Sequence, residues 1–402
     1  MTLPRRLQTA ASVQVRIDES ADPDRVSRRE RFVKRWPILA ATLGVWACSS
    51  DASQKQTGDT WNGASKPAAA TANRNSGGSV DLTGAGATFP APLYLKWFNE
   101  YAAKTGIKIN YQPLGSGAGI QQVLQQTVDF GASDAPMSDQ EMASAKAGPI
   151  LHIPTVVGLV VLGYNVPGLA QPLKLSGSLI ADIFLGKVTK WNDPRLATLN
   201  PGVKLPATDI LVVHRSDGSG TTYIFSDYLS AVSPTWKSAP GKGKDLQWPV
   251  GMGGKGNEGV AGQVKQLPNS IGYMELAYAQ QNKLSTALVQ NAAGQFVAPS
   301  AEAAAAAAED AIAKLPPNTD YRVSIVNSAG RTAYPITSFT WLLVYKNQPD
   351  AAKAKKLADV IRWALTDGEQ YNAAPLSYAP LPPSLAARLT PRIDSLTMVG
   401  SK

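Results

Sequence analysis

The sequence is poor in cysteine and histidine, which excludes several kinds of site. Its 402 residues contain one cysteine, Cys48, so no disulfide can form within the chain. The two histidines, His152 and His214, lie outside any cluster of Cys, His and carboxylate residues with the spacing of a zinc site. We therefore expect neither a metal ion nor another cofactor.

Dense basic blocks are missing as well. The formal net charge is +9, but residues 1–47 hold nine Lys/Arg against five Asp/Glu, so about +5 belongs to the rest of the chain. Lys and Arg do not gather in a block interleaved with aromatic residues, so we expect no nucleic-acid partner. A mild positive excess is instead typical of proteins that attract small anions.

The largely apolar run 37–47 is too short for a membrane-spanning helix. Basic residues precede it, and Ala47 and Cys48 follow Trp46, which is the order of a bacterial signal peptide. We predict that residues 1–47 are a signal peptide and that Cys48 carries a lipid. An ordinary signal peptide cut near an incidental cysteine is the alternative. Residues 48–79, rich in Ser, Ala, Gly, Asn, Thr and Lys, are predicted to be a flexible tether.

From Val80 onward, β-branched segments alternate with glycine-containing turns and amphipathic segments. This order predicts an α/β protein with mostly parallel sheets. The predicted strands are 80–83, 107–111, 128–132, 153–164, 210–214 and 334–345. The predicted helices are 90–105, 120–127, 221–229 and 350–365, and the alanine run 303–308 is predicted to be a surface helix without function. The two long strands, 153–164 and 334–345, are suited to cross between two lobes.

Three predicted strand-to-helix turns combine small residues with Ser or Thr at the helix start. They lie at Thr88, Ser116 and Ser219 to Thr221. A helix N-terminus offers unpaired N–H groups and partial positive charge, so converging turns would bind an oxyanion. Each turn alone is more typical of an ordinary helix N-cap.

Two charged residues stand at predicted strand ends. The guanidinium of Arg215 suits a tetrahedral oxyanion, while its neighbour Asp217 predicts an ion pair that would align Arg215. Asp134 would accept a hydrogen bond from a protonated anion such as phosphate, whereas sulfate has no proton to give. A helix-capping role for Asp134 before Pro136 is the alternative reading of the sequence.

Nine segments together resemble one family. They are LTGAGATFPAPLY (82–94), YQPLGSGAG (111–119), VDFGASDAPMSD (128–139), IPTVVGLVVLGYNVPGL (153–169), DIFLGKVTKWND (182–193), RSDGSGTT (215–222), WPVGMGGKGNEGVAG (248–262), LPNSIGYMELAYA (267–279) and PITS (335–338). From Val80 to about Gly400 the chain resembles the periplasmic phosphate-binding protein of bacterial ABC-type phosphate importers. The resemblance implies high-affinity phosphate binding, permease subunits as partners, and a place in the periplasm or cell envelope.

The resemblance also implies a set of phosphate contacts. They are Thr88, Phe89, Ser116, Asp134, Arg215, Ser219, Gly220 and Thr221, with Asp217 aligning the arginine. Gly117 stands where relatives often have a second serine. The implied fold is the two-lobed periplasmic-binding-protein fold with crossing hinge strands. We predict that 80–157 and 341–402 form lobe I and 158–340 forms lobe II.

Two other functions share this scaffold in principle. A phosphatase would use Ser219 as nucleophile and Arg215 as a phosphate clamp. Ser219 lies in G-S-G rather than G-x-S-x-G, however, and neither histidine is evidently its base. A sulfate or molybdate receptor is the other alternative, and Asp134 argues against it. The glycine-rich segment 251–257 lacks the Ser/Thr and the spacing of a P-loop, so we interpret it as a loop at the rim of a cleft.

Overall fold

A computed structural model describes residues 82–397 except residues 170 and 369–371. The predicted signal peptide, tether and Cys48 lie outside the described residues. The strands are β1 (Leu82–Gly86), β2 (Ile109–Pro113), β3 (Phe130–Ser133), β4 (Ile150–Asn165), β5 (Lys174–Leu175), β6 (Leu211–Arg215), β7 (Met252–Gly254), β8 (Ser270–Glu275), β9 (Ser285–Thr286), β10 (Leu288–Gln290), β11 (Phe296–Val297) and β12 (Thr337–Tyr345).

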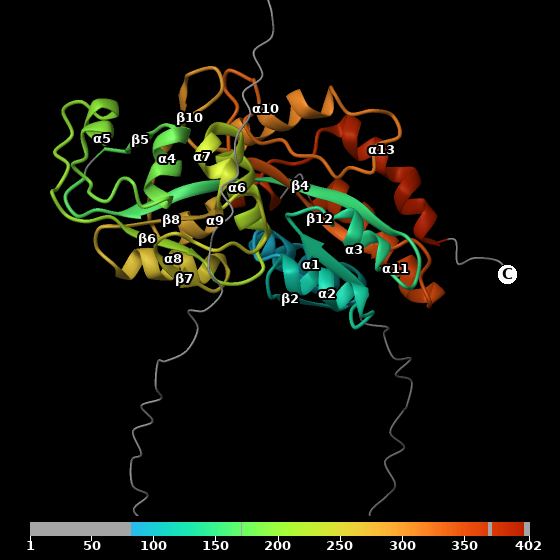
Figure 1. Cartoon of the computed structure of the whole chain (residues 1–402). Helices are drawn as coiled ribbons and strands as arrows, with labels where there is room; N and C mark the ends of the chain where they lie inside the picture. The colour runs from blue at the N-terminus through green and yellow to red at the C-terminus, as the bar shows by residue number, and fades with distance from the viewer. Residues whose placement is uncertain (1–81, 170, 369–371, 398–402) are drawn as a thin grey trace, which may run out of the picture. The chain divides into compact units, whose positions relative to one another are not determined.

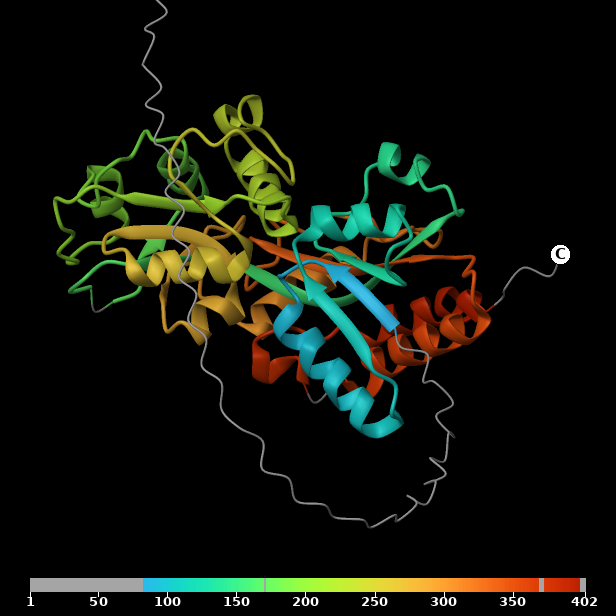
Figure 2. The same cartoon turned by 90° about the horizontal axis from the view of Figure 1, so that it is seen from below.

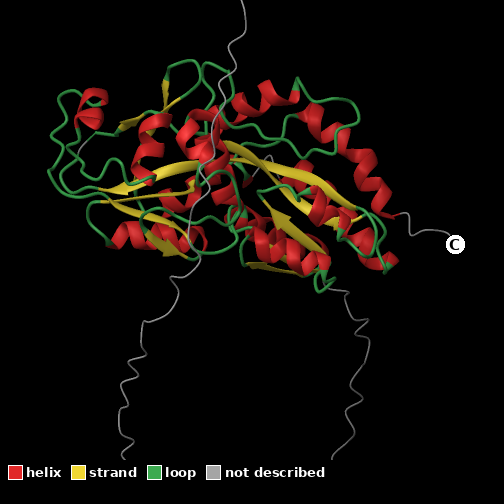
Figure 3. Cartoon of the chain, viewed as in Figure 1, coloured by secondary structure: helices red, strands yellow, loops and turns green. Residues whose placement is uncertain are grey.

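The helices follow the strands along the chain. The α-helices are α1 (Ala91–Thr105), α2 (Ser116–Leu124), α3 (Asp139–Ala143), α4 (Gly177–Phe184), α5 (Pro194–Leu199), α6 (Gly220–Val232), α7 (Pro234–Ser238), α8 (Gly256–Gln266), α9 (Leu276–Gln281), α10 (Ala301–Ile312), α11 (Ala351–Trp363) and α13 (Pro383–Asp394). Three short elements are the π-helix η1 (Ala364–Gly368) and the 3₁₀ turns η2 (Ala374–Leu376) and η3 (Ser395–Thr397). Figure 3 shows the strands as a central layer with helices on either side.

The main sheet has the strand order β2-β1-β3-β12-β4-β8-β6-β7, with β9 also paired to β4. Pairing is parallel among β2, β1 and β3 and among β8, β6 and β7. It is antiparallel wherever β4 or β12 takes part. The sheet is therefore mixed, and the prediction of mostly parallel sheets holds only away from the two long strands. The fold is the predicted two-lobed α/β fold.

Strand β4 joins the two lobes, as Figure 1 shows. Its residues up to Leu159 pair with β12, and from Val160 onward they pair with β8. Every residue from Ile150 to Tyr164 is buried, and so is the whole of β12. A strand covered on both faces has a continuous apolar sequence, which is why both runs were recognisable. The lobe boundaries proposed from the sequence, after residues 157 and 340, stay a proposal.

Several predicted elements are confirmed. Helix α1 has Pro92 in its first turn and ends at Gly106, whose φ of 74° and N–H bond to the Ala102 carbonyl form its C-cap. Figure 2, the view from below, shows α1 beside β1 and β2 and α8 beside β8. Helix α11 buries the apolar face predicted for it.

The prediction of a surface helix over the alanine run 303–308 is right about the helix but wrong about its place at the surface. It forms as α10, but Ala303, Ala304, Ala307 and Ala308 are buried, and the helix packs against β4 and β12. Methyl side chains allow the helix backbone to approach the two joining strands closely. The helix therefore covers the connection between the lobes rather than lying free at the surface.

Helix α2 also differs from the prediction, because it begins at Ser116 rather than at Ile120. Glycine has a low helix propensity, so the sequence favoured a loop over 115–119. Gly119 is required by packing: a Cβ atom there would lie 2.6 Å from the Gly86 Cα and 2.7 Å from the Ala132 carbonyl oxygen. This close approach places the N-terminus of α2 at the carboxyl ends of β1 and β3.

We expect Gly119→Ala to lower the free energy of unfolding by about 2–4 kcal/mol, because the neighbouring backbone atoms cannot move aside locally. Gly262→Ala in α8 is the matched control, since a Cβ atom there meets nothing within 4 Å. That variant should be neutral or more stable by about 0.5–1 kcal/mol, from the better helix propensity of alanine. Urea denaturation measures both, and equal effects of the two variants would contradict the packing argument.

Candidate functional site

A buried carboxylate marks the centre of the candidate site. Asp134 follows the last residue of β3 and is 1% exposed. Its Oδ1 accepts a hydrogen bond of 2.7 Å from the Thr340 hydroxyl, and its Oδ2 lies 3.4 Å from the Ser116 Oγ. Burial raises the pKa of Asp134 from 3.8 to about 7, although the Thr340 hydrogen bond and the charge of Arg215 act in the opposite direction.

Thr340 reaches Asp134 through the register of β12 with β3. Trp341 pairs with Ser133 in this antiparallel pair, so the next residues outward, Thr340 and Asp134, lie opposite each other. On its other side β12 pairs with β4, where Thr340 faces Val156 and Trp341 faces Pro154, so the extra residue of a bulge lies in β4. Nothing in the sequence indicated the contact between Thr340 and Asp134, because it depends on the alignment of strands about 200 residues apart.

Arg215, the last residue of β6, is 3% exposed and forms a two-pronged ion pair with Asp217. Its Nε and Nη2 donate to the two carboxylate oxygens over 2.8 and 2.5 Å, and its Nη1 donates to Thr221 Oγ1 over 3.1 Å. Burial alone would raise the pKa of Asp217, but the hydrogen bonds and charge of Arg215 outweigh it and lower the pKa. The predicted ion pair of Arg215 with Asp217 is present; that it aligns Arg215 for an anion stays a prediction.

The three predicted turns converge. The N–H of Gly117 in α2 donates to the Gly218 carbonyl before α6 over 2.8 Å. A Cβ atom on Gly220 would lie 2.5 Å from Ser116 Oγ and 2.6 Å from Asp134 Oδ2, so only glycine fits. The N-termini of α2 and α6, with their partly unpaired N–H groups, therefore lie side by side at the carboxylate.

The third turn, at Thr88 and Phe89, leads into α1. Both residues are buried, and their carbonyl oxygens accept hydrogen bonds of 2.6 Å from the hydroxyls of Tyr278 and Tyr378, respectively. The side-chain Nδ2 of Asn257 donates hydrogen bonds to the hydroxyl oxygens of both Thr88 and Thr221. The turn is thus fixed from both lobes.

The structure brings the eight predicted contacts into one buried group. Ser219 caps α6, its Oγ accepting the N–H of Thr222 over 3.0 Å, as the ordinary N-cap interpretation expected. Asn257, Thr340, Tyr278 and Tyr378 were missed. Asn257 belongs to the segment interpreted as a rim loop; in the structure it is fully buried in the first turn of α8.

Neither histidine joins this group. His214 stacks on Trp248 with ring centroids 4.8 Å apart, and its Nδ1 lies 2.9 Å from the Arg215 carbonyl oxygen. The Nε2 of His152 accepts the N–H of Met137 over 3.0 Å, and burial lowers the pKa of His152 to about 3. In the part of the chain that the structure describes, no three His, Cys, Asp or Glu residues form a group able to hold a metal ion.

Charged side chains gather around a hollow beside the turn that follows Asp134. A hollow of about 650 Å³ is bordered by the turn after Asp134, by Lys244 and by Arg322. Lys244 pairs with Glu141 over 2.6 Å, and Arg322 pairs with Asp139 over 2.8 Å. Because these side chains are partly exposed, each pair contributes little to stability.

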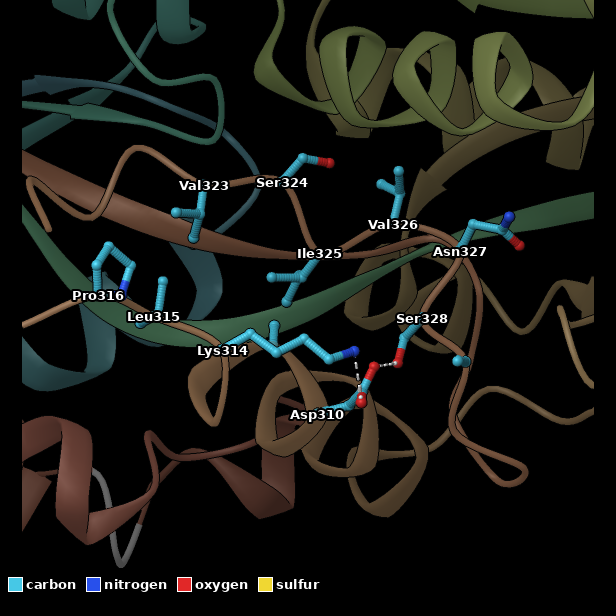
Figure 4. Close-up of a pocket in the computed structure, with 12 residues that line it drawn as sticks. Asp310, Lys314, Leu315, Pro316, Val323, Ser324, Ile325, Val326, Asn327 and Ser328 are labelled. Carbon is cyan, nitrogen blue, oxygen red and sulfur yellow. Dashed lines mark hydrogen bonds and ion pairs between the residues drawn. The ribbon is translucent and has the colours of Figure 1, made fainter.

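A second hollow, of about 420 Å³, lies away from these residues at the end of α10 (Figure 4). Its charged groups satisfy one another, since Asp310 accepts hydrogen bonds from Lys314 and Ser328, each over 2.9 Å. None of the predicted contacts lines it. Among the described residues, no helix combines the length and apolar character of a membrane span.

Comparisons with known sequences point to one family. Residues 51–367 match the PBP superfamily domain. The chain is similar to a phosphate-binding protein PstS of Xylella fastidiosa strain 9a5c, with 45% identity over 353 residues that cover 87% of this chain and 94% of the relative. It is also similar to a phosphate-binding protein PstS of Pasteurella multocida, with 47% identity over 77% of this chain and 88% of the relative.

Comparisons with solved structures support the fold. A high affinity periplasmic phosphate-binding protein, PfluDING, solved with phosphate bound, aligns with a TM-score of 0.60 at 23% identity over 77% of this chain and 92% of its own. A phosphate binding protein from Stenotrophomonas maltophilia aligns with a TM-score of 0.59 at 19% identity over 78% of this chain and 93% of its own. At these identities the likeness concerns the fold alone.

The raised pKa of Asp134 predicts a dependence of stability on pH. Between pH 3.8 and about 7 the folded protein holds a proton on Asp134 that the unfolded chain releases, so its contribution to the free energy of unfolding falls as the pH rises. Asp134→Asn removes this titration. Between low pH and pH 8, the free energy of unfolding of Asp134→Asn should therefore rise relative to that of the wild type by up to about 4 kcal/mol, since one pKa unit is about 1.36 kcal/mol.

Urea denaturation in phosphate-free buffer from pH 4.5 to 8 measures this difference. Asp217→Asn is the comparison: because the pKa of Asp217 is lowered from 3.8, its stabilising effect is lost only below that pH, so the difference between Asp217→Asn and the wild type should stay constant from pH 4.5 to 8. A constant difference between Asp134→Asn and the wild type over the whole range would contradict the assignment.

Proposed function

Since the chain belongs to the phosphate-binding protein PstS family within the PBP superfamily, we propose that it binds inorganic phosphate with high affinity outside the inner membrane. It then delivers the phosphate to the permease subunits of an ABC-type importer. One observation supports this most directly: a buried carboxylate, Asp134, stands among hydrogen-bond donors from two helix starts, the Thr88 turn and the Arg215 guanidinium.

The proposed contacts divide by chemistry. Hydroxyls, backbone N–H groups and the Arg215 guanidinium donate hydrogen bonds to any tetrahedral anion, so they do not discriminate between phosphate and sulfate. Asp134 is an acceptor and requires a proton between itself and the anion. With a pKa of about 7, it shares one proton with phosphate near neutral pH. Sulfate brings no proton and would meet an unpaired charge in a desolvated site.

Binding without catalysis is the second part of the proposal. A phosphatase that used Ser219 would need a base beside its hydroxyl, but the Oγ of Ser219 caps α6 and both histidines are engaged elsewhere. This arrangement supports a binding protein. Turnover of a chromogenic phosphate ester that disappears in Ser219→Ala would instead establish the phosphatase.

The cellular place is proposed from the sequence before residue 80. The order of basic, apolar and small residues before Cys48 supports export, with Cys48 as the lipidated first residue and 48–79 as the tether. The described domain would then reach its membrane partner without a spanning helix of its own. Mass spectrometry of the mature protein tests this, and an N-terminus well downstream of Cys48 would refute the anchor.

Anion selection provides the decisive test. Asp134→Ala should narrow the ratio of phosphate to sulfate affinity, mainly because sulfate binds better once the unpaired carboxylate is gone. Arg215→Ala should weaken the binding of both anions together, because it removes a donor that either anion can use.

In the wild type, sulfate binding should strengthen as the pH falls below about 7, where Asp134 takes up a proton of its own. Calorimetric titration of both anions into each variant measures these effects.

The outcomes separate cleanly. No phosphate binding by the wild type would overturn the proposed function. If the wild type binds phosphate but Asp134→Ala still excludes sulfate as strongly as before, selection lies with another group and the role of Asp134 is wrong.

A further inference from the structure

The side-chain amide of Asn257 joins the two lobes within the site. Asn257 is fully buried, and its Nδ2 donates to Thr88 Oγ1 over 2.8 Å and to Thr221 Oγ1 over 3.1 Å. Its Oδ1 accepts the backbone N–H of Glu275 over 2.9 Å. Since a backbone N–H can only donate, this third bond fixes which end of the amide faces the hydroxyls.

Both hydroxyl oxygens are saturated as acceptors. Thr88 Oγ1 also accepts the backbone N–H of Asn257 over 3.2 Å, and Thr221 Oγ1 also accepts Nη1 of Arg215 over 3.1 Å. A hydroxyl offers two acceptor lone pairs and one proton. With both lone pairs engaged by N–H groups, each threonine can make a further hydrogen bond only as a donor. No hydrogen bond among the described residues takes up either proton.

We infer that Asn257 is a positioning residue that fixes Thr88 and Thr221 as obligate hydrogen-bond donors toward the bound anion. The inference rests on the proposed function, since phosphate oxygens are the acceptors for the two protons. A hydroxyl without such partners can rotate and present a lone pair to the anion. The lone pair repels the anion, and no hydrogen bond forms between them. Holding donors in place before binding strengthens their contribution, because little rotational freedom is then lost.

The same contacts couple recognition to closure of the lobes. Asn257 lies on α8, which packs on β8 and β6, whereas Thr88 follows β1 in the other lobe. Tyr278 supports the arrangement by donating to the Thr88 carbonyl over 2.6 Å. Thr88 is therefore fully oriented only when α8 contacts its turn. Thr221 keeps its orientation within its own lobe, through Asn257 and Arg215.

Replacing the amide by a carboxylate tests the inference directly. In Asn257→Asp, an oxygen replaces Nδ2 and accepts the protons of Thr88 and Thr221, which turns both donors away from the anion. We expect phosphate to bind roughly 100-fold more weakly at pH 8, as for the loss of two charge-assisted hydrogen bonds. Asn257→Ala frees the hydroxyls without reversing them, so a loss of about 10-fold is expected.

Asn200→Asp is the matched control. Asn200 is buried, accepts the N–H of Lys174 and donates to the carbonyls of Lys174 and Leu196, without contact to the site. The Asn200→Asp variant should have a changed melting temperature, but its phosphate affinity should stay within about twofold of the wild-type affinity. Calorimetric titration and thermal unfolding are measured on all variants.

A double-mutant cycle separates positioning from a general structural role. In the Thr88→Val background one of the two hydroxyls is absent, so the effect of Asn257→Ala on affinity should shrink by about threefold or more. An equal effect in both backgrounds would overturn the inference, and it decides the matter even if Asn257→Asp does not fold. Normal phosphate binding by a folded Asn257→Asp variant would also overturn it. Failure of the wild type to bind phosphate would instead refute the proposed function.

Discussion

A carboxylate removed from water is the constraint on which the rest of the site depends. Burying an ionised group is costly unless hydrogen bonds or an opposite charge compensate for it. Asp134 has Thr340, Ser116 and the nearby charge of Arg215, yet its pKa still rises to about 7. The compensation is thus incomplete, and the group gains from any ligand that brings a proton. The backbone around it is constrained in turn: Gly220 must lack a side chain, and β12 must pair with β3 in the register that sets Thr340 opposite Asp134.

The ion pair of Arg215 with Asp217 limits what the guanidinium can offer. Of the five N–H groups of an arginine, Nε and one on Nη2 are taken by Asp217, and one on Nη1 by Thr221. Within the described part of the chain, one N–H on each Nη atom remains, in a fixed direction. Because Asp217 offsets the positive charge of Arg215, the proposed anion binding would depend on oriented donors more than on net charge. This agrees with a chain of only modest positive excess.

The sequence predicted those features that local rules determine. The apolar runs of β4 and β12, the proline and glycine that delimit α1, and the strand ends at Asp134 and Arg215 all follow from neighbouring residues. The start of α2 was misjudged, because Gly119 is favoured by packing against Gly86 rather than by helix propensity. Propensity and packing disagree at this position, and packing determines the structure.

The missed residues share a physical origin. Thr340 and Asn257 act through partners 206 and 169 residues away, and nothing near them in sequence indicates those partners. Thr340 lies opposite Asp134 because β12 pairs with β3, and β12 pairs on its other side with β4, the strand that joins the lobes. The acceptor Asp134 and the donor Thr88 are thus both held by contacts with elements that are distant in the sequence. Under the proposed function, a ligand that satisfies both groups would bind a closed arrangement better than an open one, and closure would follow from that difference.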